Sequence, residues 1–364
     1  MRARLLLTTD AVGGVWTYSL DLARALSRAE DMVVVLAVLG PDPTTDQLTD
    51  ATAIPGLQIV ATGLPLDWTA TDEQQVRDSS WALAALAAEA EVDLIQLHTP
   101  ALAVCPYPAP VISVVHSCVA TWWRAVRSGP LPADLAWRAT MARDGLERSD
   151  LVAAPTRAFA LAVQTAYGLP LAPHGLHNGR DAARGEQRSS DLFVLTAGRL
   201  WDAGKNVAAF DRAASLSSLP FFAAGPLEGP DGARITLSHA RSLGRLSTDA
   251  LAEQLAARPI FVSTALYEPF GLAVLEAAQA SCALVLADRP GFRELWEGAA
   301  SFVDPLDSRA IAAEIERLAA DAGARASLGA AAAKRAARYT SAAMGEAMLR
   351  LYATLAPTSL KAAA

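Results

Sequence analysis

Residues 261–294 constrain the fold most strongly, because they combine two apolar runs with a polar loop and a helical pattern. The apolar runs cover residues 261–264 and 283–287 and have the composition of buried strands. Two such runs joined through a helix form a βαβ unit, in which the helix crosses over one face of a parallel sheet. The segment therefore predicts a fold of the α/β class.

Two glutamates flank the expected start of the helix in this unit. Glu268 lies in the preceding loop, and Glu276 lies about one and a half turns inside the helix. The first N–H groups of a helix have no partner within the helix and favour anions such as phosphate. We therefore expect an anionic ligand to bind between the two carboxylates.

The alternation of strands and helices continues through the chain in two blocks. Expected strands lie at residues 4–8, 32–39, 58–60, 93–97, 111–115 and 151–155 in the first block, and at 192–196, 221–224 and 260–264 in the second. Expected helices lie at 15–29, 73–91, 157–167, 205–214, 308–320, 323–338 and 341–355. This order predicts two doubly wound domains that face each other across a cleft, where ligands of such folds bind.

The length of 364 residues also favours two domains, since single cores rarely grow so large. Residues 180–191 form the most polar stretch, and we place the boundary there, with domains at 1–180 and 181–340.

Composition excludes several classes of protein. With 52% hydrophobic and 19% charged residues, the chain is expected to be globular, and a net charge of −7 argues against nucleic acid as a partner. Three scattered cysteines predict neither a disulfide framework nor a zinc site. The apolar run after Met1 ends before Asp10, and no run approaches the roughly 18 residues of a membrane span. We therefore expect a cytoplasmic protein.

Four polar side chains follow or flank expected strand ends and could face a cleft. His98 and His116 each follow an apolar run, and that of His116 is the purer. Arg199 and Lys205 flank the loop after the first strand of the second domain, where a guanidinium and an ammonium group can bind a diphosphate. The loop at Gly13 lacks the G-x-G-x-x-G spacing, which disfavours a dinucleotide-dependent dehydrogenase.

A basic and aromatic region covers residues 118–149 and contains Trp122, Trp123, Arg124 and Arg127. It would suit a weak peripheral contact with a membrane or an acceptor. Acidic residues dilute its charge, so we favour a pair of amphipathic helices with solvated arginines.

These motifs together resemble the retaining GT-B glycosyltransferases of the family-4 type, relatives of glycogen and sucrose-phosphate synthases. The matching residues span 12–294 and include an E-x7-E motif around P-F-G-L: Val12 to Val15, His116, His177 to Gly179, Gly198 to Leu200, Lys205, Asn206, Glu268 to Leu272 and Glu276. The resemblance implies GT-B architecture with two Rossmann-like domains. It also implies that the last helix, about 341–356, packs back on the first domain.

The resemblance further implies a nucleotide-diphosphate sugar as the donor substrate. Arg199 and Lys205 would neutralise the diphosphate, with hydrogen bonds from the amides of Gly14, Gly271 and Leu272. Glu276 would accept from the ribose, whereas Glu268 and the Phe270 amide would hold the sugar. His116, from the other domain, would lie near the reacting sugar carbon. Asp10, Gly13 and Trp16 border the expected acceptor side.

The sugar would be transferred with retention of configuration through a front-face route, and neither a metal nor another cofactor is expected. The acceptor could be a small molecule, a glycan or a lipid-linked sugar, and the sequence leaves the nucleobase and the oligomeric state open. Two alternatives remain: a nucleotide-sugar epimerase of the same architecture, and a non-catalytic nucleotide-sugar-binding protein. Ser281 and Ala283 depart from the glycine and proline common in the family, and Ser281 is a weaker helix stop.

Overall fold

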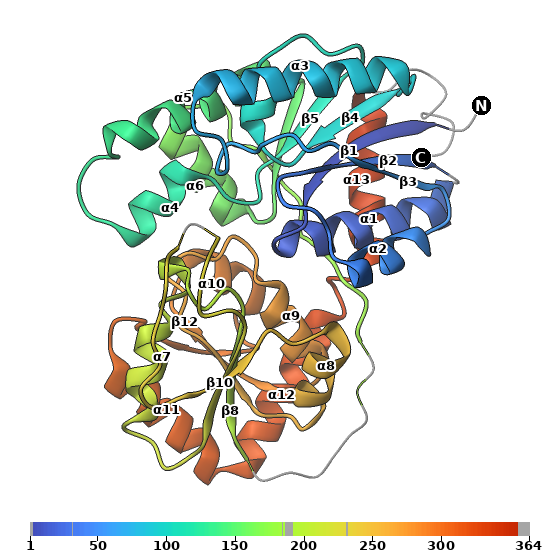
Figure 1. Ribbon diagram of the computed structural model, residues 1–364. Coiled ribbons are helices and arrows are strands. Elements are labelled where there is room, and N and C mark those ends of the chain that lie inside the picture. The colour runs from blue at the N-terminus through green and yellow to red at the C-terminus, as the bar shows by residue number, and fades with distance from the viewer. Residues whose placement is uncertain (1–2, 31, 184, 186–191, 231, 356–364) are drawn as a thin grey trace. The chain divides into compact units, whose positions relative to one another are not determined.

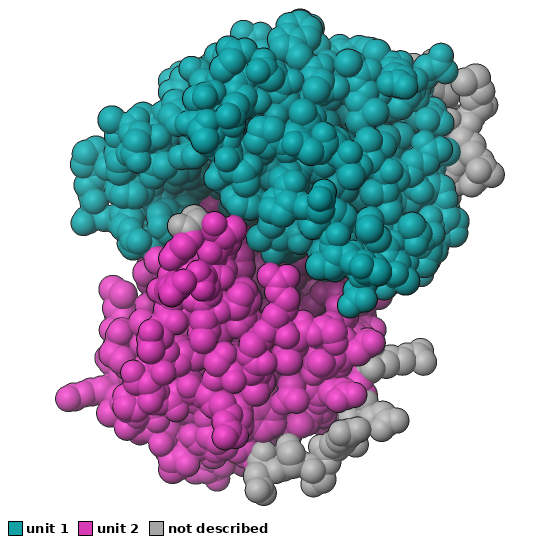
Figure 2. Space-filling view, in the orientation of Figure 1, with its two compact units in different colours: residues 1–179, 341–364 teal, residues 180–340 magenta. Residues whose placement is uncertain are grey.

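The computed structural model describes residues 3–30, 32–183, 185, 192–230 and 232–355 (Figure 1). The chain divides into two compact units (Figure 2). Unit 1 comprises residues 1–179 and 341–364, and unit 2 comprises residues 180–340. Each unit is an α/β domain with its own parallel sheet.

Unit 1 contains a seven-stranded sheet in the order β3-β2-β1-β4-β5-β6-β7, and all its pairs are parallel. The strands are β1 (Arg4–Asp10), β2 (Val33–Leu39), β3 (Leu57–Ala61), β4 (Leu94–Leu97), β5 (Val111–Val114), β6 (Leu151–Ala154) and β7 (His174–Gly175). The connecting helices are α1 (Gly14–Glu30), α2 (Thr45–Thr52), α3 (Glu73–Glu89), α4 (Val119–Val126), α5 (Ala133–Arg148) and α6 (Arg157–Tyr167), with a 3₁₀ turn η1 (Pro100–Leu102).

The central strands of unit 1 are mostly apolar and buried because helices cover both faces of the sheet. Leu5 and Leu7 of β1 pack into one core cluster with α1, whereas Leu6 packs into a second cluster with α3. All three leucines are fully buried. Alternate residues of one strand therefore supply two separate cores, as the period of two in a strand requires.

Unit 2 contains a six-stranded parallel sheet in the order β10-β9-β8-β11-β12-β13. The strands are β8 (Val194–Ala197), β9 (Phe221–Ala224), β10 (Arg241–Gly244), β11 (Ile260–Ser263), β12 (Ala283–Ala287) and β13 (Ser301–Val303). The helices are α7 (Val207–Ala214), α8 (Thr248–Ala256), α9 (Leu272–Gln279), α10 (Pro290–Trp296), α11 (Ser308–Ala320) and α12 (Ala322–Ala336), with a 3₁₀ turn η2 (Ala203–Lys205). Numbered from its own first strand, this sheet has the order 3-2-1-4-5-6 of a dinucleotide-binding fold.

The last helix, α13 (Ser341–Leu355), belongs to unit 1 and packs against α1 (Figure 1). Its residues Met344, Met348 and Tyr352 lie in the same core cluster as Leu22 and Leu26 of α1. The chain therefore crosses between the units twice, after Gly179 and after Thr340.

The basic and aromatic region forms the two expected helices, α4 and α5, which contact each other. Arg138 stacks over Trp137 at 4.7 Å and donates to the carbonyl oxygens of Asp67 and Ala70, while Arg143 pairs with Glu147. These two arginines thus have partners within unit 1.

Several elements differ from the sequence-based expectations. Helix α10 was not expected; it begins at Pro290, because proline without an N–H is well tolerated at a first helical position. Strands β10 and β13 were not expected, since β10 is polar and largely exposed and β13 has only three residues. The helices α2 and α8 were also missed, although each begins at a Thr or Ser cap.

Candidate functional site

The carboxyl ends of β8 and β11 bring Lys205 and Glu268 together in unit 2. Several hydrogen bonds join the two loops: Leu266 and Tyr267 donate backbone N–H groups to the carbonyl oxygen of Gly204, and the Thr264 hydroxyl donates to that of Asn206. The ammonium group of Lys205 forms an ion pair with the carboxylate of Glu268. Their side chains are 19% and 17% exposed, so the pair is largely shielded from water.

The start of α9 lies directly after Glu268 in the same loop. Gly271 caps this helix with a φ of 92°, a conformation that other residues rarely adopt. An added Cβ would also lie 3.2 Å from Cγ of Glu268. Phe270 is 3% exposed and stacks edge-on against Tyr339, so only its backbone could reach a ligand. The backbone N–H groups at Gly271 and Leu272 thus begin a helix beside an ion pair, an arrangement suited to phosphate.

Arg199 also follows β8, but it pairs with Asp202 at 2.9 Å and stacks over Trp201. The second oxygen of Asp202 accepts from the backbone N–H of Gly204, which shapes the turn that carries Lys205. Arg199 is 41% exposed, so its ion pair is the weaker of the two.

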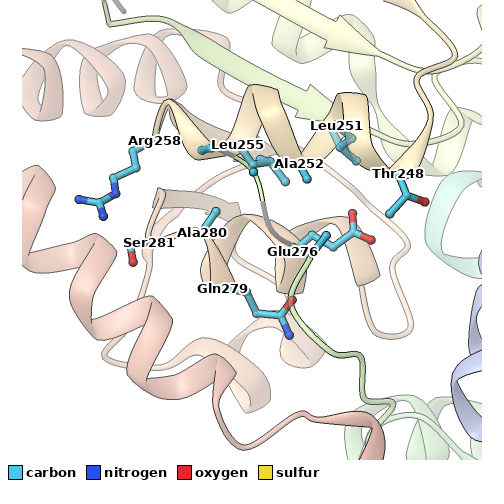
Figure 3. A pocket seen from close by; sticks show the side chains of 12 residues that line it. Thr248, Leu251, Ala252, Leu255, Arg258, Glu276, Gln279, Ala280 and Ser281 are labelled. Atoms are coloured by element: carbon cyan, nitrogen blue, oxygen red, sulfur yellow. The ribbon is translucent and has the colours of Figure 1, made fainter. Parts of the chain in front are cut away.

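Glu276 lies on α9 and lines a groove between α8 and α9 that has a volume of about 380 Å³ (Figure 3). Its carboxylate forms an ion pair with Arg180, the first residue of unit 2. Glu268 lines a different and smaller pocket, together with Lys205 and Gly198. The two glutamates of the motif therefore have separate cationic partners and line separate cavities.

The turns after β9 and β10 lie beside each other, since the Gly225 N–H donates to the carbonyl oxygen of Gly244 at 2.7 Å. Both turns follow carboxyl ends of strands in the sheet that carries Lys205. Gly244 is exposed at this point, whereas Gly225 is buried.

In unit 1, His116 follows β5 and belongs to a cluster of rings. It packs edge-on against Tyr18 at 4.4 Å and against His98 at 4.7 Å. Its Nε2 atom is buried and has no hydrogen-bond partner among the residues that the structure describes. Burial lowers the pKa of His116 to about 3, so the ring is neutral near pH 7.

His98 has defined partners on both ring nitrogens. The Gln96 amide nitrogen, at 2.8 Å, can only donate, so Nε2 of His98 accepts and the ring proton lies on Nδ1, facing Ser19 at 3.3 Å. The Tyr352 hydroxyl donates to the Gln96 carbonyl oxygen at 2.5 Å, which orients that amide. Burial and the neighbouring His116 hold the pKa of His98 well below its usual value. Tyr352 of α13 thus fixes, through Gln96, the tautomer of His98, which lies beside His116.

The expected acceptor-side residues also lie in unit 1, at the carboxyl end of β1. Asp10 accepts from the backbone N–H of Val12, and the carbonyl oxygen of Gly13 accepts from Trp16. Gly14 is exposed at the start of α1, but Trp16 is 6% exposed and belongs to the core. Only a small edge of the indole could therefore touch an acceptor.

Sequence reasoning missed three contributors to these sites: Arg180, Gln96 and Tyr352. Arg180 lies in the polar stretch assigned to the boundary, and Tyr352 is 256 residues from its partner Gln96. No local pattern links residues so far apart. Among the residues that the structure describes, no helix is long and apolar enough to cross a membrane, and no group of three or more His, Cys, Asp or Glu side chains could hold a metal ion.

Comparisons with known proteins agree with this architecture. Residues 12–184 match the family model Glycosyltransferase Family 4, and residues 233–335 match Glycosyl transferases group 1. No curated protein matches the chain in sequence.

Solved structures share the fold over the whole chain. Sucrose-phosphate synthase from Thermosynechococcus elongatus matches with a TM-score of 0.78 and 17% identity, covering 100% of both chains. HepE from Anabaena, in complex with UDP-glucose, matches with a TM-score of 0.75 and 20% identity, covering 97% of this chain and 100% of its own. A glycosyltransferase from Rickettsia africae matches with a TM-score of 0.72 and 13% identity, covering 97% and 98%. With both halves matching these models in order, and with two parallel α/β units of the GT-B type, the chain belongs to the family-4 type of glycosyltransferases.

Proposed function

We propose that the protein transfers a sugar from a nucleoside-diphosphate sugar to a hydroxyl group of an acceptor, with retention of configuration and without a metal. The observation that supports this most directly is the Lys205–Glu268 ion pair beside the start of α9. It combines a cation, a helix N-terminus and a carboxylate at the carboxyl edge of a parallel sheet. A diphosphate joined to a sugar presents the matching groups, negative charge next to hydroxyls.

Lys205 and Arg199 would bind the diphosphate, together with the backbone N–H groups of Gly271 and Leu272. An ammonium group has three N–H donors, so Lys205 can contact a phosphate oxygen while it still contacts Glu268. Glu268 would then accept from sugar hydroxyls, close to the Phe270 amide. Both cations would also stabilise the charge that develops on the leaving diphosphate, and no metal is needed for this role.

The groups of unit 1 would act on the acceptor and on the reacting carbon. His116 would contact the sugar as a neutral ring, and the Gly14 amide would contact the diphosphate. Asp10 and Gly13, with the exposed edge of Trp16, would border the acceptor. The acceptor is a hydroxyl compound, either small, glycan or lipid-linked.

In the proposed reaction, the bond between the anomeric carbon and the phosphate oxygen breaks, and the acceptor oxygen bonds to the same face of that carbon. The acceptor proton passes to an oxygen of the leaving diphosphate. The separate cationic partners and separate cavities of Glu268 and Glu276 favour this route over a double displacement, which needs a carboxylate at the reacting carbon.

A UDP-sugar is the first donor to test, since HepE was solved with UDP and with UDP-glucose. The three cysteines are free thiols, which fits the cytoplasm as the compartment we propose.

Ligand-induced stabilisation of the purified protein tests the donor site. A nucleoside diphosphate at about 100 times its Kd should add roughly 2.7 kcal/mol to the free energy of unfolding, so UDP, GDP and ADP are compared by thermal shift. Lys205→Met should weaken the best ligand at least about 10-fold, because a charge-assisted contact is lost. Lys334→Met, at an exposed lysine of α12, is the matched control and should bind like the wild type.

Two results would refute the proposal: no shift with any of the three nucleotides, or unchanged affinity in Lys205→Met. Acceptor-dependent release of the nucleoside diphosphate from the sugar donor separates a transferase from an epimerase, which needs no acceptor. Binding without any release would identify a non-catalytic binder.

A further inference from the structure

Three contacts hold Arg180 to other residues of unit 2 in the part of the chain that the structure describes. Its backbone N–H donates to the carbonyl oxygen of Tyr339 at 3.0 Å, and its own carbonyl oxygen accepts from Nε2 of Gln279 at 2.6 Å. Its guanidinium group pairs with the carboxylate of Glu276, and the two side chains are 17% and 15% exposed. Arg180 is therefore a fixed part of unit 2, although it is the first residue after the crossing from unit 1.

The two side chains that hold Arg180 come from one face of α9. Glu276 and Gln279 are three residues apart, so they lie next to each other on the helix surface. Gln279 fixes the backbone of Arg180 while Glu276 binds its side chain. With the backbone fixed, the guanidinium group restricts the directions in which the Glu276 carboxylate can point.

Glu276 lies at one end of the groove between α8 and α9, and Arg258 and Ser281 lie at the other end (Figure 3). A carboxylate has two oxygens and about four lone-pair directions, so it can accept from a guanidinium and from hydroxyl groups together. The Arg180 charge also offsets that of Glu276, which lowers the repulsion between this carboxylate and a bound diphosphate.

We propose that Arg180 is a positioning residue for recognition of the ribose: it orients the Glu276 carboxylate toward the ribose hydroxyls and offsets its charge beside the diphosphate. This inference rests on the proposed function, in which Glu276 accepts from the ribose. Arg180 itself does not contact the donor.

The test compares UDP with 2′,3′-dideoxy-UDP by calorimetry, using the full chain, on the wild type and on Arg180→Leu. Loss of the oriented carboxylate should weaken UDP about 10-fold or more, because hydrogen bonds to a charged group are lost. The dideoxy nucleotide lacks the ribose hydroxyls, so its affinity should fall by less than about 3-fold. Arg180→Lys should recover part of the UDP affinity, and Arg258→Leu, which removes an arginine at the far end of the groove, should leave it unchanged.

Equal losses for UDP and the dideoxy nucleotide would overturn the inference, because they would indicate a general structural role for Arg180. Unchanged or tighter UDP binding in Arg180→Leu would also overturn it, the latter by showing that Arg180 competes with the ribose. In either case the proposed function stands as long as the wild type binds UDP. If the wild type binds no nucleoside diphosphate, the proposed function and the role of Arg180 are both refuted. In turnover assays, the donor KM of Arg180→Leu should rise more than kcat falls.

Discussion

The packing of α13 on α1 depends on Gly345, and replacing this residue by alanine should reveal how closely the helices approach. An added Cβ at Gly345 would lie 2.7 Å from Cβ of Ala25. Two carbon atoms in contact normally lie about 3.5–4.0 Å apart, so the helices would have to separate by roughly an ångström. Both positions are in helix interiors, so substitutions there also change helix propensity.

The two effects have opposite signs and can be separated in a double-mutant cycle. In the wild type, Gly345→Ala should raise the free energy of unfolding by about 1 kcal/mol through helix propensity and lower it by about 1–3 kcal/mol through overpacking. The expected result is therefore no change or a loss of up to about 2 kcal/mol. Ala25→Gly removes the opposing methyl group, and in that background Gly345→Ala should gain about 1 kcal/mol. The coupling between the two sites should be about 1–3 kcal/mol.

The four proteins are compared by urea unfolding followed by tryptophan fluorescence. Six of the eight tryptophans belong to unit 1, namely Trp16, Trp68, Trp81, Trp122, Trp123 and Trp137, so the signal reports mainly the unit that contains both helices. Equal stabilisation by Gly345→Ala in both backgrounds, with coupling below about 0.5 kcal/mol, would refute the close approach of α13 and α1.

Three further predictions concern single residues. Ser281 has a φ of 62°, so Ser281→Gly should raise the free energy of urea unfolding by about 1 kcal/mol, and a loss would contradict the strained turn. Burial lowers the pKa of His116 to about 3, whereas its value in the unfolded chain is near 6.5. Between these two pKa values the unfolded state binds more protons, so the free energy of unfolding falls as the pH falls. From pH 6.5 to 5, His116→Gln should remove up to about 2 kcal/mol of that fall, and identical dependence on pH in the two proteins would exclude a buried neutral ring. Burial acts to raise the pKa of Asp211, but hydrogen bonds from the backbone N–H groups of residues 238–240 outweigh it and lower the pKa. Asp211→Ala should therefore lower the free energy of unfolding by about 3 kcal/mol at pH 7. This loss should shrink as the pH falls through the pKa of Asp211 in the folded protein, and a loss that does not depend on pH would contradict a role for the charge.

Most elements of the fold could be predicted from sequence because their signals are local. The strands β9 and β12 and the helices α6, α11 and α13 have the expected bounds. An apolar run of four to eight residues between turn residues needs burial on both faces, and a parallel sheet covered by helices provides it. The failures have local causes too: β10 is an exposed edge strand, and α10 is a short helix that begins at a proline.

The residues of the candidate site were predictable only in part. Lys205, Glu268 and Glu276 stood out through strand-end placement and motif spacing, and the structure joins the first two in one ion pair. Arg180 did not stand out, since its partner Glu276 lies 96 residues away. The same holds for Tyr352, which reaches Gln96 from α13.

By itself, the sequence determined the α/β class, the two blocks of strands and helices and the chemical types of the candidate residues, because periodicity and motif spacing act over a few residues of chain. Only the tertiary structure decided which charges pair. It placed Arg180 on Glu276 and Lys205 on Glu268. The physical reason is that ion pairing depends on distance in space, and packing of the sheets and helices sets that distance for residues far apart in the chain.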